Sequence, residues 1–154
     1  MSDPSWTTGF PLDSQELEIL GAITALSALI DAVSEGLLAR LVSPDDWQAV
    51  MVLTAGQPIS WRLERIRRAN AVSSHGAPEI DAWAVSARAA VEKRNALVHA
   101  AWIMRHEEFG AVGHRSRNGG PVFDFHTRAD MEAVMSELRT VYDLGLSLAN
   151  RLQH

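Results

Sequence analysis

Cysteine is absent from the 154 residues of this chain. This absence excludes a disulfide framework, a thiolate metal site and a cysteine nucleophile, and with them several classes of enzyme. Lysine is almost absent as well, because Lys93 is the only lysine among 14 basic residues and the others are arginine. Arginine is the better suited of the two to two-point contacts with phosphate or carboxylate groups. The chain thus carries groups suited to anion contacts and none suited to thiol chemistry.

Neither a signal peptide nor a long uninterrupted apolar run is evident. The opening "MSDPSWTTGFPLDS" carries acids and prolines where a signal peptide would carry basic and then apolar residues. The longest apolar stretch, residues 19–42, is interrupted by Asp31, Glu35 and Arg40, which predicts that it is too polar to span a bilayer. Since 47% of the residues are hydrophobic and 21% are charged, the composition is that of an ordinary globular domain. We therefore predict a cytoplasmic, single-domain protein without membrane partners.

The net charge of −5 conceals an uneven distribution along the chain. Residues 1–59 hold eight acids and one base, residues 60–117 hold ten bases and six acids, and residues 118–154 hold five acids and three bases. The acidic total argues against broad coating of nucleic acid, yet the basic middle third could form one phosphate-binding groove. The simpler alternative is that the basic third pairs with the acidic first third inside the fold.

Apolar residues at helical spacing predict a helical domain over residues 13–154, preceded by a loosely ordered lead of residues 1–12. Asp13 or Ser14 is a suitable cap for a long first helix. A second helix is predicted to begin at Ser43, because a proline and two acids follow it. The apolar stripe of the first helix comprises Ile19, Ile23, Leu26, Ile30, Val33, Leu37 and Leu41.

A third helix is predicted over residues 60–73, and Pro78 opens a fourth, which contains "KRNALVHAAW". The arginines of the third helix are expected to face largely outward: Arg62, Arg65, Arg67 and Arg68. An Asn-Gly-Gly break between two short runs predicts a small β-hairpin over residues 103–126. Thr127 then caps the last helix, whose apolar stripe includes Leu138, Val141 and either Leu144 or Gly145. The predicted fold is all-α, a bundle of about five helices with a hairpin insertion before the last.

The fourth predicted helix places a charged residue where an apolar one is expected. Arg94 falls near the centre of the apolar side of this helix. A charge buried there needs a partner, which either the fold or a ligand must supply. The apolar positions are Ala87, Ala90, Val91, Leu97, Val98 and Ala101. A polar line along one flank comprises Arg88, Glu92, Asn95 and His99.

The segment "RNALVH" resembles the motif of the HEPN superfamily, in which arginine, a polar residue and a later histidine lie on a late helix of a small α-helical bundle. Many members of that family are metal-independent endoribonucleases that act as dimers, often as toxins or phage-defence effectors. The resemblance implies that Arg94, Asn95 and His99 are catalytic, that RNA is the substrate, and that the chain is a homodimer needing no cofactor or metal. It also implies a nucleotidyltransferase as antitoxin, but the tyrosine that such partners modify is replaced here by Ala101.

The chemistry that the resemblance implies is RNA cleavage to a 2′,3′-cyclic phosphate. A base must take the proton of the ribose 2′-hydroxyl, and an acid must protonate the leaving 5′-oxygen. Histidine can take either role near neutral pH, so two copies of His99 across a dimer would divide them. Arg94 would contact the non-bridging phosphate oxygens, and Asn95 would orient the phosphate or the histidine.

The same residues have structural interpretations that the sequence leaves open. Arg94 could form a buried salt bridge with Glu16, which occupies a seam position of the first helix. His99 could be a histidine at the edge of the core, bonded to a backbone carbonyl. Arg88 and Glu92 are candidate substrate-binding residues, but their spacing of four is also typical of a surface ion pair.

His114 and Arg115, on the predicted hairpin, complete the candidate substrate-binding residues, although a solvated loop would carry the same side chains. The histidines show no metal-ligand spacing. Two hypotheses follow from the sequence. The first is a dimeric, metal-independent endoribonuclease of the toxin or phage-defence type. The second is a non-catalytic HEPN-like helical dimer, a binding or scaffold module in which Arg94 is structural.

Overall fold

The computed structural model describes residues 12–99, 111–117 and 120–152, with side chains described over residues 12–99 and 126–152. Within these residues the chain forms five helices and one two-stranded sheet, in the order α1–α2–α3–α4–β1–β2–α5. The fold is therefore an all-α bundle, as the helical periodicity predicts. Most of the predicted N-terminal lead lies outside the described residues, but Leu12 at its end is buried.

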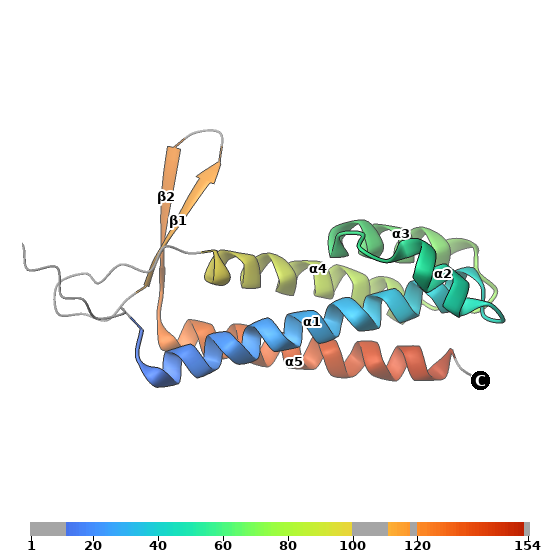
Figure 1. Ribbon diagram of the computed structural model, residues 1–154, viewed down its shortest axis with the longest axis horizontal. Helices are drawn as coiled ribbons and strands as arrows, with labels where there is room; N and C mark the ends of the chain where they lie inside the picture. The colour runs from blue at the N-terminus through green and yellow to red at the C-terminus, as the bar shows by residue number, and fades with distance from the viewer. Residues whose placement is uncertain (1–11, 100–110, 118–119, 153–154) are drawn as a thin grey trace, which may run out of the picture.

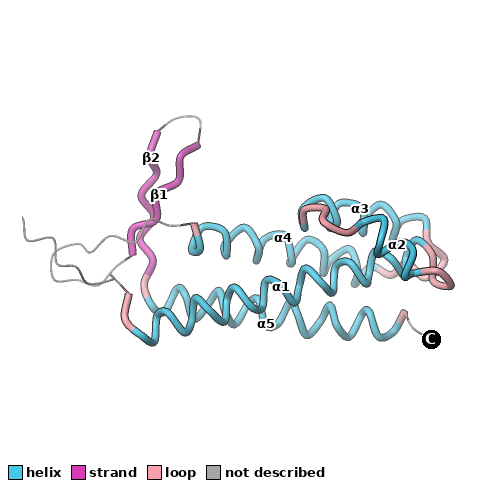
Figure 2. Tube along the Cα trace, viewed as in Figure 1, coloured by secondary structure: helices cyan, strands magenta, loops and turns pink. Residues whose placement is uncertain are grey.

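Three long helices lie side by side along the length of the molecule (Figure 1). They are α1 (Ser14–Val42), α4 (Pro78–Val98) and α5 (Arg128–Arg151). Because α1 and α5 run in one direction and α4 runs in the other, the end of α4 lies at the same end of the bundle as the starts of α1 and α5. The shorter helices α2 (Trp47–Thr54) and α3 (Ile59–Val72) lie at the opposite end (Figure 2).

The strands β1 (Ala111–Arg117) and β2 (Gly120–His126) pair in antiparallel fashion, with Ala111 opposite His126 and Arg117 opposite Gly120. They lie beside the end of α4 in Figure 1. Both strands fall inside the stretch of residues 103–126 from which a hairpin is expected. The Asn118–Gly119 part of the predicted break lies outside the described residues.

The start of α1 is fixed by a reciprocal pair of hydrogen bonds. The Glu16 backbone N–H donates to Asp13 Oδ1 at 2.8 Å, and the Asp13 backbone N–H donates to Glu16 Oε2 at 3.0 Å. This capping box satisfies two backbone donors that the first turn of a helix otherwise leaves open. The predicted cap at Asp13 is confirmed. Arg128, the first residue of α5, bonds to Asp13 and to Gln15 Oε1, so it ties the starts of α1 and α5 together.

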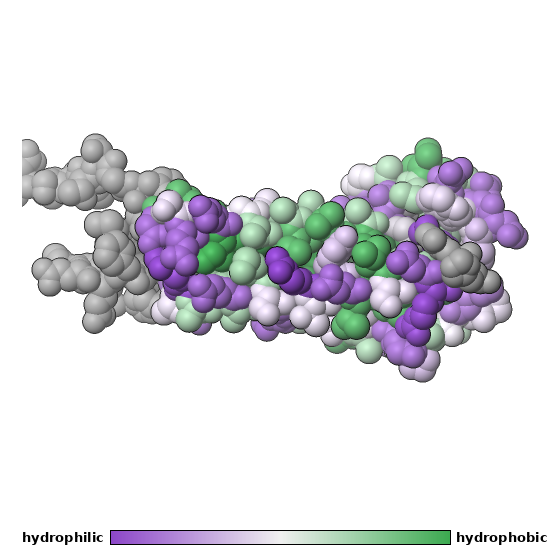
Figure 3. Space-filling model, turned by 90° about the horizontal axis from the view of Figure 1, so that it is seen from below, coloured by the Kyte–Doolittle hydropathy of each residue, from purple (hydrophilic) through white to green (hydrophobic). Residues whose placement is uncertain are grey.

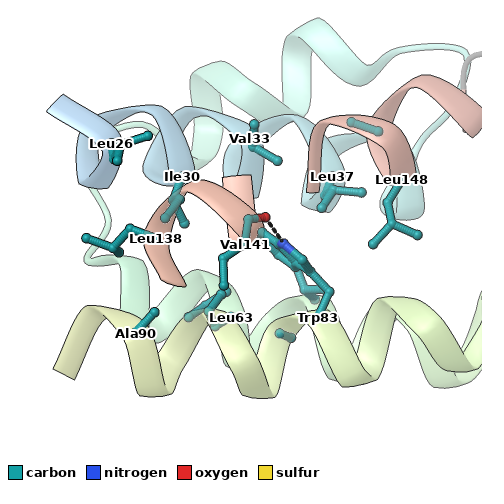
Figure 4. Packing of buried hydrophobic residues seen from close by; sticks show 14 of the residues in the cluster. Leu26, Ile30, Val33, Leu37, Leu63, Trp83, Ala90, Leu138, Val141 and Leu148 are labelled. Atoms are coloured by element: carbon teal, nitrogen blue, oxygen red, sulfur yellow. Dashed lines mark hydrogen bonds between the residues drawn. The ribbon is translucent and has the colours of Figure 1, made fainter. Parts of the chain in front are cut away.

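The core lies between the apolar stripes of α1, α4 and α5 (Figure 4). All seven residues of the predicted α1 stripe are buried, which confirms that part of the sequence analysis. In α5, Gly145 is buried whereas Leu144 is 54% exposed, so the stripe passes through the glycine. Trp83 of α4 is 2% exposed, and its Nε1 donates to the Val141 carbonyl at 2.8 Å. A Cβ at Gly145 would lie 2.7 Å from this indole, so the glycine makes room for the tryptophan.

The start of α2 differs from the prediction. Ser43 is the C-cap of α1 and not the N-cap of α2, and its backbone N–H donates to the Ala39 carbonyl at 2.9 Å, which closes the last turn of α1. A turn follows, and α2 begins only at Trp47, after an N-cap, Asp46, whose side chain makes no capping hydrogen bond. The Ser-Pro-Asp sequence therefore lies at the end of α1 and in the turn that follows, because α1 extends to Val42 and leaves Ser43 as its last capping residue.

The helix α1 is long and apolar enough to cross a membrane by length and composition, so the expectation that no segment spans a bilayer stays a prediction. This helix contains an 18-residue window with a mean hydropathy of 1.7, of which 33% is buried. The core helix of a soluble bundle has the same property, so the helix alone does not fix the location of the protein.

Leu17 and Leu29 of α1 are each 44% exposed. Figure 3 shows apolar areas alternating with polar ones along the face of the bundle seen from below.

Candidate functional site

The candidate catalytic residues lie at the carboxyl end of α4. Arg94 and Asn95 belong to its last turns, and His99 is the C-cap residue that follows Val98. The His99 backbone N–H donates to the Asn95 carbonyl at 3.1 Å and closes the helix. The expectation that the helix continues through this histidine is therefore wrong. The following residues, including Ala101, lie outside the described part of the chain.

Arg94 is half-buried, and its guanidinium is only partly satisfied. Its Nη1 donates to Asn95 Oδ1 at 2.8 Å, while its Nε is buried and finds no hydrogen-bond acceptor among the described residues. No ion pair of Arg94 is found among the residues that the structure describes. The adjacent cation, Lys93, does have an ion pair, because its Nζ lies 2.6 Å from Glu137 Oε2. This pair links α4 to α5. A buried N–H without an acceptor costs free energy, so Arg94 retains capacity to bind an anion.

The alternative salt bridge between Arg94 and Glu16 is absent. Glu16 is 8% exposed, and its carboxylate accepts the Asp13 backbone N–H at the start of α1. Its other oxygen lies 3.8 Å from Arg128 Nη2. The Glu16 carboxylate therefore caps the start of α1 and contacts Arg128 of α5. It is engaged there and does not pair with Arg94.

His99 is exposed, and its ring makes no hydrogen bond within the described residues. The alternative of a core-edge histidine bonded to a carbonyl is thus not supported there. Asn95 and His99 are four residues apart and share one side of the helix end. Arg94 lies five residues before His99, which corresponds to roughly 140° around a helix and about 7.5 Å along it. One copy of α4 therefore presents the guanidinium and the imidazole in different directions.

The candidate substrate-binding residues fall into two groups. Arg88 Nε lies 3.6 Å from Glu92 Oε1, and both side chains are more than half exposed, which confirms the surface ion pair. In β1, His114 lies opposite Phe123 and Arg115 lies opposite Val122. The side chains of that strand lie outside the described residues.

Arg62 is the arginine of α3 for which the predicted outward orientation is wrong. The structure shows it 3% exposed rather than outward. Its Nε donates to Ser34 Oγ at 3.1 Å, its Nη1 donates to the Gln57 carbonyl at 2.6 Å, and its Nη2 pairs with Asp31. The outward prediction is confirmed for the other arginines of α3: Arg65, Arg67 and Arg68.

The signal that would have located Arg62 lies on α1. Ser34 is fully buried, and the half-exposed Asp31 lies three residues before it, so two polar acceptors occur close together on α1. Because a buried polar group needs a partner, Ser34 predicts a donor on the helix that packs against it. The buried guanidinium of this fold is therefore a link between α1 and α3.

Over residues 12–99 and 126–152, no group of three His, Asp or Glu side chains is placed to hold a metal ion. The candidate site instead offers a guanidinium, a carboxamide and an imidazole.

No protein-family model, no curated protein and no solved structure matches this chain. The resemblance to the HEPN superfamily therefore depends on the six residues "RNALVH" and on their place near the end of a late helix in a helical bundle.

Proposed function

We propose that this protein is a HEPN-like, metal-independent endoribonuclease that acts as a homodimer in a toxin or phage-defence setting. Arg94, Asn95 and His99 are its catalytic residues, and RNA is cleaved to a 2′,3′-cyclic phosphate. The cytoplasm is the expected location, and a protein antitoxin is the expected partner. The hairpin is the expected extension of the RNA-binding surface.

The state of Arg94 is the observation that carries this proposal. Its Nε is buried and has no acceptor within the described part of the chain, and Glu16, the acid that the sequence suggests as its structural partner, is engaged at the start of α1. A phosphate oxygen would supply the missing acceptor through a charge-assisted hydrogen bond. The hydrogen bond from Arg94 Nη1 to Asn95 Oδ1 supports this role, because it holds the guanidinium against the side chain of a second residue of the motif.

The need for two copies follows from the geometry of one helix. Since Arg94 and His99 diverge by roughly 140° on a single α4, they do not converge on one phosphate within a protomer. A two-fold axis near the ends of two α4 helices would bring the imidazole of one copy to the guanidinium of the other. One His99 would then take the 2′-hydroxyl proton and the other would protonate the 5′-oxygen.

The test is cleavage of a 5′-labelled RNA by the full chain in the presence of EDTA. We expect a product ending in 2′,3′-cyclic phosphate, identified by mass spectrometry. His99→Ala should lower the rate by about 10²- to 10⁴-fold, the usual contribution of a positioned acid or base. Arg94→Ala should also abolish cleavage, whereas Arg139→Ala, which alters an exposed arginine on α5, should not.

Two outcomes would overturn the proposal: no RNA cleavage by the full chain, or cleavage that survives His99→Ala. Circular dichroism of each variant confirms that loss of cleavage does not reflect unfolding. Growth arrest on expression, relieved by His99→Ala, would support the toxin setting. Without cleavage, the non-catalytic helical dimer would take its place.

A further inference from the structure

Apolar side chains are exposed most strongly at the end of the bundle that carries α2 and α3. Among the described residues, the four most exposed large apolar side chains are Val72 at 86%, Leu53 at 81%, Val52 at 77% and Val42 at 56%. All four belong to α2, to α3 or to the last residue of α1. Clustered apolar exposure of this kind is typical of a binding surface.

Three of these residues line one cavity. Val42, Leu53 and Val72 surround a hollow of about 860 Å³ between the end of α1, α2 and α3. Its inner wall is formed by apolar and aromatic side chains, among them Leu38, Leu41 and Trp61. Pockets for small molecules commonly have volumes of roughly 300–1,000 Å³ and a mainly apolar lining with a few polar groups. This hollow has that size and that lining.

Positive charge outweighs negative charge around the cavity. Two arginines, Arg65 and Arg68, line it, against one acid, Asp45. Arg68 Nε bonds to a carboxylate, that of Glu64, at 2.9 Å. Arg65 forms no ion pair with the residues that the structure describes.

The guanidinium of Arg65 lies 5.2 Å from the ring centroid of Trp61, which places it against the aromatic wall of the cavity. An apolar hollow with such a cation at its edge complements a molecule with an apolar body and one anionic end.

We propose that this cavity binds an anionic amphiphile, a small molecule with an acyl chain and a terminal carboxylate. The chain would lie between α2 and α3, covering Leu53 and Val72, and the carboxylate would meet Arg65. This site is separate from the candidate ribonuclease residues, because α2 and α3 lie at the opposite end of the bundle from the end of α4 (Figure 1). It therefore does not depend on RNA cleavage.

The test is isothermal titration of the full chain with dodecanoate below its micelle concentration. Dodecyltrimethylammonium, which has the same chain length and the opposite charge, is the matched ligand. We expect dodecanoate to bind about tenfold more tightly, as one charge-assisted contact would provide. Arg65→Gln should remove this preference, and Leu53→Gln should weaken both ligands several-fold.

The matched controls are Arg139→Gln and Leu144→Gln, which change an exposed arginine and an exposed leucine of α5. These variants should bind dodecanoate as the unaltered chain does. The proposal is overturned if dodecanoate does not bind, if both ligands bind equally well, or if Leu144→Gln weakens binding as much as Leu53→Gln. Absence of binding would leave the exposed apolar surface to a protein partner.

Discussion

Arg62 and Arg94 illustrate two ways in which a helical bundle holds an arginine. Arg62 on α3 is 3% exposed, and all three of its donor nitrogens have a partner in the fold: Ser34, the Gln57 carbonyl and Asp31. Arg94 on α4 is half-buried, and over residues 12–99 and 126–152 it bonds to Asn95 alone while its buried Nε has no acceptor. The donor nitrogens of Arg62 all have acceptors within the protomer, whereas the Nε of Arg94 has none among the described residues.

The difference shows that burial alone does not assign a role to an arginine. A buried charge is tolerated where the fold supplies acceptors for its donors, and it then contributes to the fold. A charge whose donors stay open is held at a cost that a bound anion would offset. Arg62 therefore joins α1 to α3, whereas the described residues give the Arg94 Nε no acceptor of this kind.

The largest expected effect on stability comes from replacing each arginine with methionine. Arg62→Met should lower the free energy of unfolding by about 2–3 kcal/mol, because it leaves Ser34 and the Gln57 carbonyl without their partner. Arg94→Met should cost less than about 1 kcal/mol, since it removes one hydrogen bond and also an unsatisfied N–H. Urea denaturation measures both values. Equal losses would mean that Arg94 is a structural residue, and the ribonuclease proposal would lose its main support.

Removing a side-chain acceptor of each arginine should give the same contrast in stability, with smaller losses in the free energy of unfolding. Ser34→Ala leaves the Arg62 Nε buried without a partner, so we expect a loss of about 1–2 kcal/mol. Asn95→Ala frees a half-exposed donor of Arg94 that water can reach, so the loss should stay below about 1 kcal/mol. Denaturation curves of the two variants, compared with the same parent, provide the measurement. A larger loss for Asn95→Ala would show that the Arg94–Asn95 bond fastens the end of α4.

The sequence predicts those parts of the fold that depend on local physics. The stripe from Ile19 to Leu41 predicts the buried side of α1, because helical spacing places those residues on one side whatever packs against them. Asp13 and Thr127 predict helix starts, because a capping box needs only residues three apart. Both features are properties of a few neighbouring residues.

The sequence does not predict features that depend on other helices. The helical periodicity of residues 60–73 predicts that Arg62 faces outward. This prediction fails because the acceptors of its guanidinium lie on α1, 28 and 31 residues earlier in the chain. The end of α4 is missed because apolar residues continue to Trp102, so the pattern carries no stop signal at His99. In the candidate site, the pattern places Arg94 on the apolar side of the fourth helix and leaves open whether Glu16 or a ligand is its partner.

A third prediction concerns the cap at the start of α5, which lies at the same end of the bundle as Arg94. Hydrogen bonds from the Thr127 backbone N–H and hydroxyl lower the pKa of Asp130 below its ordinary value. This capping contribution is therefore present at neutral pH and is lost as the pH falls through the lowered pKa. Thr127→Ala should cost about 1 kcal/mol at pH 7, and less where Asp130 is protonated in both states. Thermal unfolding between pH 7 and pH 3 measures this, and a loss that does not change with pH would contradict it.

The smallest expected effect concerns Arg88, a third kind of arginine, which is exposed and paired with an exposed acid. Its Nε lies 3.6 Å from Glu92 Oε1, with the two side chains 56% and 68% exposed. Water screens such a pair, so a double-mutant cycle with Arg88→Ala and Glu92→Ala should give a coupling of about 0.3–0.5 kcal/mol, smaller at high salt. A coupling above about 1 kcal/mol would show that this pair stabilises the fold, as the contacts of Arg62 do. If Arg88 instead contacts RNA, Arg88→Ala should raise KM for cleavage while this small coupling is retained, and that result separates a surface ion pair from a substrate contact.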